Sequence, residues 1–379
     1  MLNFLAAVGG VTLIAVVLWE AFETIVLPRR VSRRVRLTRF FYRFTWVPWI
    51  LLAGRYKNKK RRDALFSYYG PLSLLLLMAL WAATLVAGFG LVHYGTNSSF
   101  SGAIFPSRLG NALYISGTTL FTLGLGDITP ASPAARLITV LEAGIGFGFF
   151  ALVIGYLPVL YQAFSRREVT ISLLDARAGT PPTAYELLRR HAGPDHRDSL
   201  TQVLNDWERW AADLMESHLS YPVLAYFRSQ HDNQSWLSSL VAILDVCTLA
   251  IVGIDGLESY QAKMTFAIAR HALVDLSQIF SAPPTTLEPL DRLADEDLVF
   301  LRQKLQEAGF TLNHSEAALA HLEEIRGLYE PFAASLARYL RLDLPPWIRR
   351  EPAKDNWQTS FWKPKQVEKA AVSVADDHF

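Results

Sequence analysis

The chain of 379 residues contains a single cysteine, Cys247, so no disulfide can form within it. One cysteine agrees with a reducing compartment for the part of the chain that carries it. Charge is also scarce, because Asp, Glu, Lys and Arg make up 19% of the residues while hydrophobic residues make up 51%. Between Ala64 and Ser107 there is no charged residue at all. This composition indicates a membrane protein.

Several motifs are missing as well. After residue 165 the sequence has no Gly-x-Gly-x-x-Gly, no phosphate-binding loop and no His-Glu-x-x-His, so a conventional dinucleotide-binding or calcium-gating domain is not expected. Residues 169–345 contain no recognisable nucleophile–base or metal motif. We therefore predict that the protein is not an enzyme, has no cofactor and no catalytic residue, and does not bind nucleic acid.

Acidic residues are rare in the first half of the chain. Residues 1–167 hold 17 Lys or Arg against 5 Asp or Glu, while the remainder holds 20 against 30. Such a change of charge and hydropathy marks the main division of the chain near residue 165. The predicted parts are residues 1–63, an N-terminal membrane helix with a basic segment; 64–167, a second membrane module described below; 168–350, a helical cytoplasmic domain; and 351–379, a flexible tail.

Three apolar segments are long enough to cross a membrane, which takes roughly 20 residues of helix. They are Asn3–Leu27, Tyr69–His93 and Leu137–Phe164. The first lacks a basic start and is longer than the apolar part of a signal peptide, so we expect it to remain as a membrane helix. It also lacks a ladder of arginines, so voltage sensing by charged helix motion is not expected.

The basic residues predict the orientation of these spans. Pro28–Asp63 carries 13 Lys or Arg and one acidic residue, and short loops rich in Lys and Arg stay in the cytoplasm. Arg166 and Arg167 directly follow the third span and predict the same orientation. The chain is therefore predicted to lie in the cell membrane with its N-terminus outside and its C-terminal half in the cytoplasm.

Within the basic loop, Phe40–Ala53 is apolar, carries Trp46 and Trp49, and is too short to span. We expect it to lie in the membrane interface. The flanking cations either bind anionic lipid or only set the topology. Nearby, Glu20 and Glu23 lie on one face of the first span, where we expect them to pair with Arg29 or Arg30 or to face the bundle interior.

The segment between the second and third spans neither spans the membrane nor resembles an ordinary loop. Ser107 is a candidate N-cap for a short helix over Arg108–Phe121. The sequence Thr-Leu-Gly-Leu-Gly-Asp of residues 122–127 follows. Non-helical backbone at membrane depth is tolerated where it lines a water-filled path. Glycines at alternate positions allow consecutive carbonyl groups to face one axis, where they can replace the water shell of an ion.

This segment resembles the pore loop of the potassium-channel family, whose signature is Thr-x-x-Thr-Val-Gly-Tyr-Gly-Asp. Thr119, Thr122, Gly124, Gly126 and Asp127 match, with Leu for Val and Leu for Tyr at the two variable positions. The resemblance covers about 100 residues, in the order outer helix, pore loop and inner helix.

It implies a selectivity filter formed by Thr122, Leu123, Gly124, Leu125, Gly126 and Asp127, with K+ held through the first four of these residues. One loop per chain implies a homotetramer. Leucine at 125 cannot supply a phenol's hydrogen bond, which makes the degree of selectivity the property to test.

The third span carries the features of a gate. Gly146 falls where inner helices of this family commonly have a hinge glycine, and Pro158 removes a helical hydrogen bond. Phe150 and Ile154 follow Gly146 in steps of four, so they are expected to line the cavity or to form a constriction. Gly144 and Gly148 form a small-xxx-small pair suited to packing on the pore helix, and which glycine is the hinge stays open. Glu142 is expected to brace Asp127 or the pore helix; the alternative is a place in the ion path.

From residue 169 onward the hydrophobic period is helical. We therefore predict an all-α fold with three transmembrane helices, a re-entrant pore helix and an α-helical cytoplasmic domain. Helices are expected over Ala184–Arg190, Ser199–Ser217, Ser235–Val252, Leu257–Phe280, Asp295–Glu307 and Ser315–Leu342. The apolar run of residues 238–254 has Asp245 at its centre, which favours a buried core helix over a fourth span. Glu216–His231 is read as a ligand pocket, a subunit contact or a packed helix end.

The sequence thus predicts a potassium-selective channel subunit, gated at the inner helix and modulated by a cytoplasmic domain that binds an unidentified ligand. Two alternatives stay open: a poorly selective cation channel, and a membrane-tethered receptor or enzyme that acts through residues 169–345.

Overall fold

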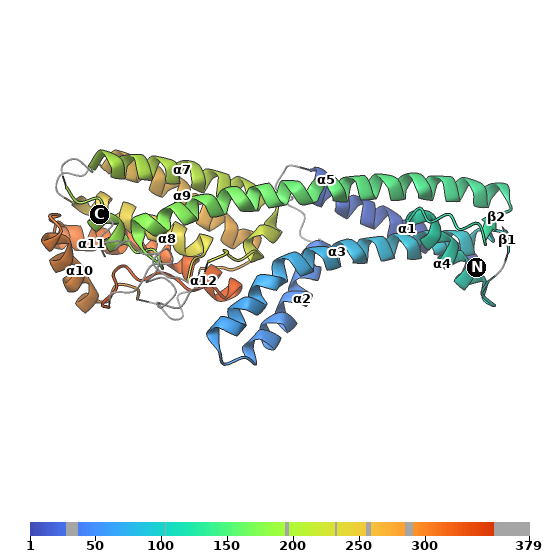
Figure 1. The fold of residues 1–379 in the computed structure, drawn as a ribbon, viewed down its shortest axis with the longest axis horizontal. Helices are drawn as coiled ribbons and strands as arrows, with labels where there is room; N and C mark the ends of the chain where they lie inside the picture. The colour runs from blue at the N-terminus through green and yellow to red at the C-terminus, as the bar shows by residue number, and fades with distance from the viewer. Residues whose placement is uncertain are drawn as a thin grey trace, which may run out of the picture. The chain divides into compact units, whose positions relative to one another are not determined.

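The computed structural model describes residues 1–27, 37–102, 104–193, 197–231, 233–254, 259–284 and 291–351. These residues are almost entirely helical (Figure 1), which confirms the predicted all-α class of membrane protein. The chain separates into two compact units, residues 1–162 and 163–379, and helix α5 (Pro133–Ala178) contributes to both. The division into four parts stays a prediction, and residues 352–379 of the expected tail lie outside the described residues.

The first unit begins with α1 (Leu2–Ala21), which continues into a π-helical turn at Phe22–Val26. It then contains α2 (Leu37–Gly54), α3 (Lys59–Gly95), α4 (Arg108–Leu120) and the start of α5. The two-residue strands β1 (Phe100–Ser101) and β2 (Thr129–Pro130) pair antiparallel on either side of the pore loop. Among the described residues, four helical segments are long and apolar enough to cross a membrane: Leu2–Val26, α3, α5 and a helix of the second unit.

Glycines bring α1 and α3 into close contact. A methyl group at Gly88 would lie 3.1 Å from the carbonyl oxygen of Gly10 and 2.8 Å from Cγ1 of Ile14. A methyl group at Gly10 would in turn collide with the backbone of Gly88. Small residues allow two helix backbones to approach in this way where no hydrophobic effect drives membrane helices together. The extra N-terminal helix is therefore packed against the outer helix of the pore module, around the buried side chains of Trp81 and Leu85.

The carboxylate of Glu20 explains where α2 begins. It accepts hydrogen bonds from the backbone N–H groups of Leu37 and Thr38, both 3.2 Å long, and from the Thr38 hydroxyl at 2.7 Å. The first N–H groups of a helix lack partners within it and favour a negative charge. Of the two expectations for Glu20, facing the interior is confirmed. Arg29 and Arg30, the other predicted partners, lie outside the described residues.

The helices of the second unit lie close to the predicted residue ranges. They are α6 (Ala184–Arg190), α7 (Arg197–Ser220), a 3-10 turn at Pro222–Tyr226, α8 (Trp236–Gly253), α9 (Ser259–Ile279), α10 (Asp295–Glu307), α11 (Glu316–Gly327) and α12 (Glu330–Leu340). The single helix expected over Ser315–Leu342 is wrong, because the chain breaks at Tyr329 and Pro331 opens the next helix.

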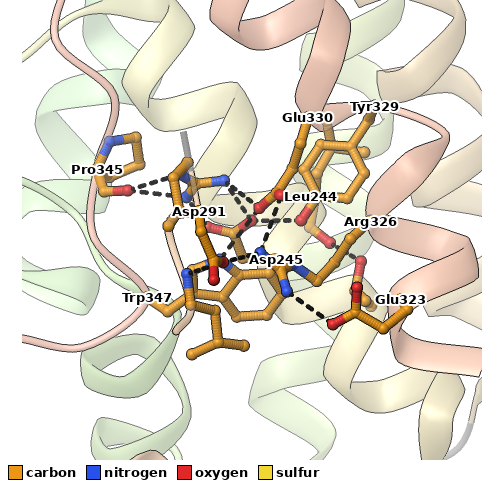
Figure 2. Close-up of polar contacts among 12 residues, drawn as sticks. Leu244, Asp245, Asp291, Glu323, Arg326, Tyr329, Glu330, Pro345 and Trp347 are labelled. Carbon is orange, nitrogen blue, oxygen red and sulfur yellow. Dashed lines mark hydrogen bonds and ion pairs between the residues drawn. The ribbon is translucent and has the colours of Figure 1, made fainter. Parts of the chain in front are cut away.

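Helix α8 forms the core of the second unit, as expected for the run around Asp245. Asp245 has no exposed surface, and its carboxylate accepts two hydrogen bonds from Arg292 and one of 2.5 Å from the Tyr329 hydroxyl. Figure 2 shows how Glu330, Arg326 and Trp347 extend this network around the carboxylate. A buried charge needs paired partners of this kind, so Asp245 is a structural residue of a helical domain.

Candidate functional site

The pore helix α4 begins where the sequence predicts. The Ser107 side chain accepts a hydrogen bond from the backbone N–H of Gly110, which confirms it as the N-cap, and the helix ends at Leu120. Leu120, Ile115 and Ala112 are buried against the neighbouring helices. The C-terminal end of a helix carries a partial negative charge. The polypeptide therefore leaves α4 directly into the Thr-Leu-Gly-Leu-Gly segment from an end that favours a cation.

The backbone after α4 alternates between two conformations. Thr122, Gly124 and Gly126 have φ angles of 57°, 56° and 78°, whereas Leu123 and Leu125 between them are not in the left-handed region. Alternation of this kind turns successive peptide carbonyls to the same side of an extended chain. No atom of the chain lies within 4 Å of a Cβ built on Gly124 or Gly126. Glycine is therefore needed here for its φ angle and not for space.

Two backbone hydrogen bonds attach this segment to the helix before it. The N–H of Thr122 donates to the carbonyl oxygen of Thr119 at 3.0 Å, and the N–H of Leu123 donates to that of Thr118 at 2.8 Å. Leu123 and Leu125 are 60% and 62% exposed in the single chain. Their side chains are thus free to pack against other copies of the chain.

Asp127 is fixed at the outer end of the segment. Its Oδ2 accepts a hydrogen bond of 2.6 Å from the Tyr114 hydroxyl of the pore helix, and its Oδ1 accepts one of 3.0 Å from the N–H of Ile128. The sequence did not predict Tyr114 as a partner, because the two residues are joined only when the loop folds back on α4. The sequence feature that could have identified this partner is a phenol on the exposed face of the pore helix.

Glu142 of α5 braces the pore helix, one of the two roles expected for it. It is completely buried and accepts a hydrogen bond from the Ser116 hydroxyl of α4. Its Oε2 lies 3.7 Å from Nε2 of His93, at the end of α3. The second expected partner, Asp127, is held by Tyr114 instead. His93 was missed from the sequence, where it marked only the end of a span.

Gly146 touches the end of the pore helix. A methyl group at this position would lie 2.8 Å from the carbonyl oxygen of Leu120 and 3.2 Å from its Cα. By contrast, no atom of the chain lies within 4 Å of a Cβ at Gly144 or Gly148. The expectation that this pair packs on the pore helix is therefore wrong for the single chain, because the contact belongs to the glycine between them.

The other residues predicted for the gate occupy different surroundings. The ring of Phe150 lies 5.7 Å from that of Phe121, below the end of the pore helix. Ile154 is 70% exposed, and α5 passes through Pro158 without interruption. The structure thus brings Gly146 and Phe150 to the C-terminal end of the pore helix, while the roles of hinge and constriction stay predictions.

Helix α5 is anchored in the second unit by Arg167. Its side chain is 2% exposed and donates hydrogen bonds to the carbonyl oxygens of Leu224 and Phe227, at 2.9 and 2.8 Å. Arg167 also donates to Nε2 of His218 at 3.2 Å, and it pairs with Glu168. Arg167 was expected only as a topology signal, but it is a buried structural residue. The segment Glu216–His231 is thereby in part a packed helix end.

No group of three or more His, Cys, Asp or Glu side chains among the described residues is placed to hold a metal ion.

An outer helix, a pore helix with an alternating loop, and an inner helix define the class of protein as a pore-loop ion channel. Residues 75–162 match the family model described as "Ion channel". This stretch of the chain is therefore similar to the pore module of ion channels.

Three curated proteins are similar to parts of the chain. "Two pore potassium channel c" of Oryza sativa is 43% identical over 60 residues, 16% of this chain and 13% of that one. "Uncharacterized membrane protein YdjJ" of Bacillus subtilis is 24% identical over 198 residues, 52% of this chain and 56% of that one. "Protein LctB" of Geobacillus stearothermophilus is 25% identical over 123 residues, 30% of this chain and 91% of that one. The chain thus spans little more than half of the Bacillus subtilis protein and a small part of the rice protein. No solved structure matches.

Proposed function

We propose that this chain is the subunit of a homotetrameric channel that conducts K+ through the backbone carbonyls of Thr122, Leu123, Gly124 and Leu125. The observation that carries the proposal is the alternation of positive φ at Thr122, Gly124 and Gly126 directly after the pore helix. Carbonyl rings can replace the hydration shell of a monovalent cation. One chain supplies one strand of the filter, so four copies related by cyclic symmetry would close it.

Potassium selectivity is the finer part of the proposal. It is supported by the match to the family signature and by the hydrogen bond between Tyr114 and Asp127, which braces the outer end of the filter. A poorly selective cation channel is the competing function, favoured by Leu125, whose side chain offers no hydrogen bond to the wall around the filter.

The proposed topology has three transmembrane helices, α1, α3 and the first part of α5, with the N-terminus outside. The 13 Lys or Arg of Pro28–Asp63 support it. Helix α8 is then excluded from the membrane because its apolar window is 89% buried inside the second unit. Helix α2 presents exposed Phe40, Phe44, Val47 and Leu51, at the spacing of one helix face. This face would lie in the membrane interface, with lipid as its partner.

Gating at the inner helix and modulation by the cytoplasmic unit complete the proposal. Helix α5 runs over residues 133–178, so in this proposal a movement of the cytoplasmic unit would reach Gly146 and Phe150 along that helix. Replacing Gly146 with Ala should favour the closed channel; an unchanged open probability would remove Gly146 from the gate. A small molecule that binds the cytoplasmic unit would be the ligand that moves it, and binding without any effect on flux would favour the alternative of a tethered receptor.

The deciding experiment is ion flux into liposomes that contain the purified protein. We expect K+ flux well above Na+ flux, and equal fluxes would favour the poorly selective channel. Gly124→Ala should abolish flux while the tetramer persists, because alanine is strained at a φ of 56°. Gly327→Ala is the matched control, since that helical glycine has an open surrounding in the second unit. Wild-type flux in Gly124→Ala would remove the filter assignment.

A further inference from the structure

A small cavity of about 170 Å³ lies beside the pore helix. It is enclosed by the end of α3, the strand β1 and the start of α4, with Arg108 and Gly102 exposed at its rim. His93 and Asn111 form part of its buried wall. A partly polar cavity of this kind has room for water. The cavity is lined by Ser98 as well as His93, and the His93 imidazole itself has no exposed surface.

Only one of the two ring nitrogens of His93 has a hydrogen-bond partner. Its Nδ1 lies 3.0 Å from the hydroxyl oxygen of Ser98, while its Nε2 has no hydrogen-bond partner. Oε2 of Glu142 lies 3.7 Å from Nε2, and this oxygen has no hydrogen-bond partner either. Both side chains are fully buried. A distance of 3.7 Å is too long for a direct hydrogen bond, so two unsatisfied polar atoms face each other.

The surroundings contain few other charges. Of the residues that line the cavity, Arg108 is the further charged one, and its guanidinium is bound to Oδ1 of Asn97 and lies over the ring of Tyr94. On the remaining sides His93 meets the ring of Phe100 and the pore helix near Asn111 and Ala112. Glu142 is thus the acidic group that faces the imidazole.

We propose that His93 and Glu142 form a proton-binding site that is filled through the cavity and that sets how firmly the inner helix holds the pore helix. A buried carboxylate and a neutral imidazole with no partner both cost free energy. One bound proton joins them, as an imidazolium–carboxylate pair. A second proton breaks that pair, since it neutralises Glu142 and leaves the imidazolium alone.

The link to the filter is Ser116. Its hydroxyl donates to Oε1 of Glu142 and also lies 2.9 Å from the carbonyl oxygen of Val86. A hydrogen bond to a carboxylate is about twice as strong as one to a neutral acid. Loss of the charge on Glu142 therefore weakens the bond that fixes α4, four residues before Leu120, where the filter strand begins. We expect acid on the cavity side to lower conduction.

This inference rests on the proposed channel function and its topology, in which the cavity faces outside. The test is K+ flux in liposomes while the pH on the cavity side is changed from about 8 to about 4, which covers the ordinary ranges of both histidine and glutamate. The wild-type flux should fall about fivefold or more, as for a typical coupling between two sites. In Glu142→Gln the ratio of the two fluxes should approach one, whereas His93→Gln keeps the carboxylate and should keep a fall in flux, displaced in pH. Glutamine keeps an oxygen that can accept from Ser116 but does not titrate.

His271→Gln is the matched control, because His271 forms an exposed pair with Asp275 at 3.6 Å in the second unit. It should leave the flux ratio of the wild type unchanged. A wild-type flux that does not respond to pH, or a Glu142→Gln variant with the wild-type ratio, would overturn the inference.

A second measurement keeps the test independent of conduction. The infrared difference spectrum of the full chain between the two pH values should contain a carboxyl band that disappears in Glu142→Gln. If the protein conducts no ions, the proposed function fails but this band still decides whether the site binds a proton. Its absence from the wild-type spectrum would overturn the inference even in a conducting channel.

Discussion

The Tyr114 hydroxyl lies 2.6 Å from Oδ2 of Asp127 and donates a hydrogen bond that joins the pore helix to the outer end of the proposed filter. The proposed filter strand leaves α4 at Thr122 and reaches this hydrogen bond at Asp127. Leu125 lies between these two residues. Since the leucine side chain has no polar group, the Tyr114–Asp127 bond carries much of the polar attachment at this end. Loss of this hydrogen bond should reduce ion selectivity before it affects assembly of the tetramer.

Tyr114→Phe should reduce the ratio of K+ to Na+ permeability by about two- to tenfold, the effect of losing one hydrogen bond. The phenyl ring keeps the packing against Phe105, whose ring lies 5.8 Å away. Reversal potentials in mixed K+ and Na+ would measure the change. Tyr260→Phe is a suitable control, because Tyr260 is 70% exposed in the second unit. An unaltered ratio in Tyr114→Phe would show that this bond does not support the filter.

The contact between Gly10 and Gly88 predicts an asymmetry between neighbouring glycines of α1. Gly10→Leu should separate α1 from α3 and destabilise the membrane unit, because its side chain would collide with the backbone of Gly88. Gly9→Leu should have little effect, since Gly9 has no atom within 4 Å of its Cβ position. Thermal unfolding of the protein in detergent would compare the two. Equal melting temperatures would indicate that α1 does not depend on this crossing.

The sequence predicts elements that local rules define. Ser107 gave the start of the pore helix, and alternate glycines gave the positions of positive φ, because caps and left-handed backbone depend on single residues. The partnership of Glu142 with Ser116 was predicted only as one of two options. The pairing of Asp245 with Arg292 was not predicted, because 47 residues separate them and only the folded chain brings them together.

Arg167 shows a second limit of prediction from the sequence. Its position after an apolar span is what the topology rule expects, and nothing in the adjacent residues distinguishes it from Arg166. In the structure Arg166 is exposed while Arg167 is buried under the carbonyl groups of Leu224 and Phe227. Burial depends on packing between distant segments, which a periodic pattern does not report. The same reason explains why the sequence analysis overlooked His93.

The Asp245 network predicts a large loss of stability on truncation. Asp245→Ala should lower the free energy of unfolding of the second unit by about 3–5 kcal/mol, because it leaves Arg292 buried without its main partner. Denaturant unfolding followed by tryptophan fluorescence would report it, since Trp347 lies within the network. Glu307→Ala is the control: Glu307 pairs with Lys304 on the surface, where ion pairs contribute little. A midpoint for Asp245→Ala equal to that of the control would show that the network is not a source of stability.

The pair of Arg167 and His218 predicts a pH dependence in the second unit. Burial, with the nearby Arg167 guanidinium, holds the pKa of His218 well below its usual range. Arg167 can only donate, so Nε2 of His218 must be the unprotonated nitrogen, and Nδ1 then donates to the carbonyl oxygen of Leu214 at 2.9 Å. The native state therefore keeps the imidazole neutral, while the unfolded chain binds a proton below about pH 6.5.

The direction in which stability changes with pH follows from this difference in proton binding. Stability from His218 is fully present above the pKa of the unfolded chain, and it is lost as the pH falls below that value, by up to about 1.4 kcal/mol per pH unit. His218→Gln keeps an acceptor for Arg167 and removes the titration. Hydrogen exchange of the α7 peptides should accelerate between about pH 7.5 and about pH 5.5, after correction for intrinsic rates, and this acceleration should be smaller in His218→Gln. His321→Gln, an exposed substitution, should behave as the wild type. The same acceleration in His218→Gln would show that other groups govern the opening of α7.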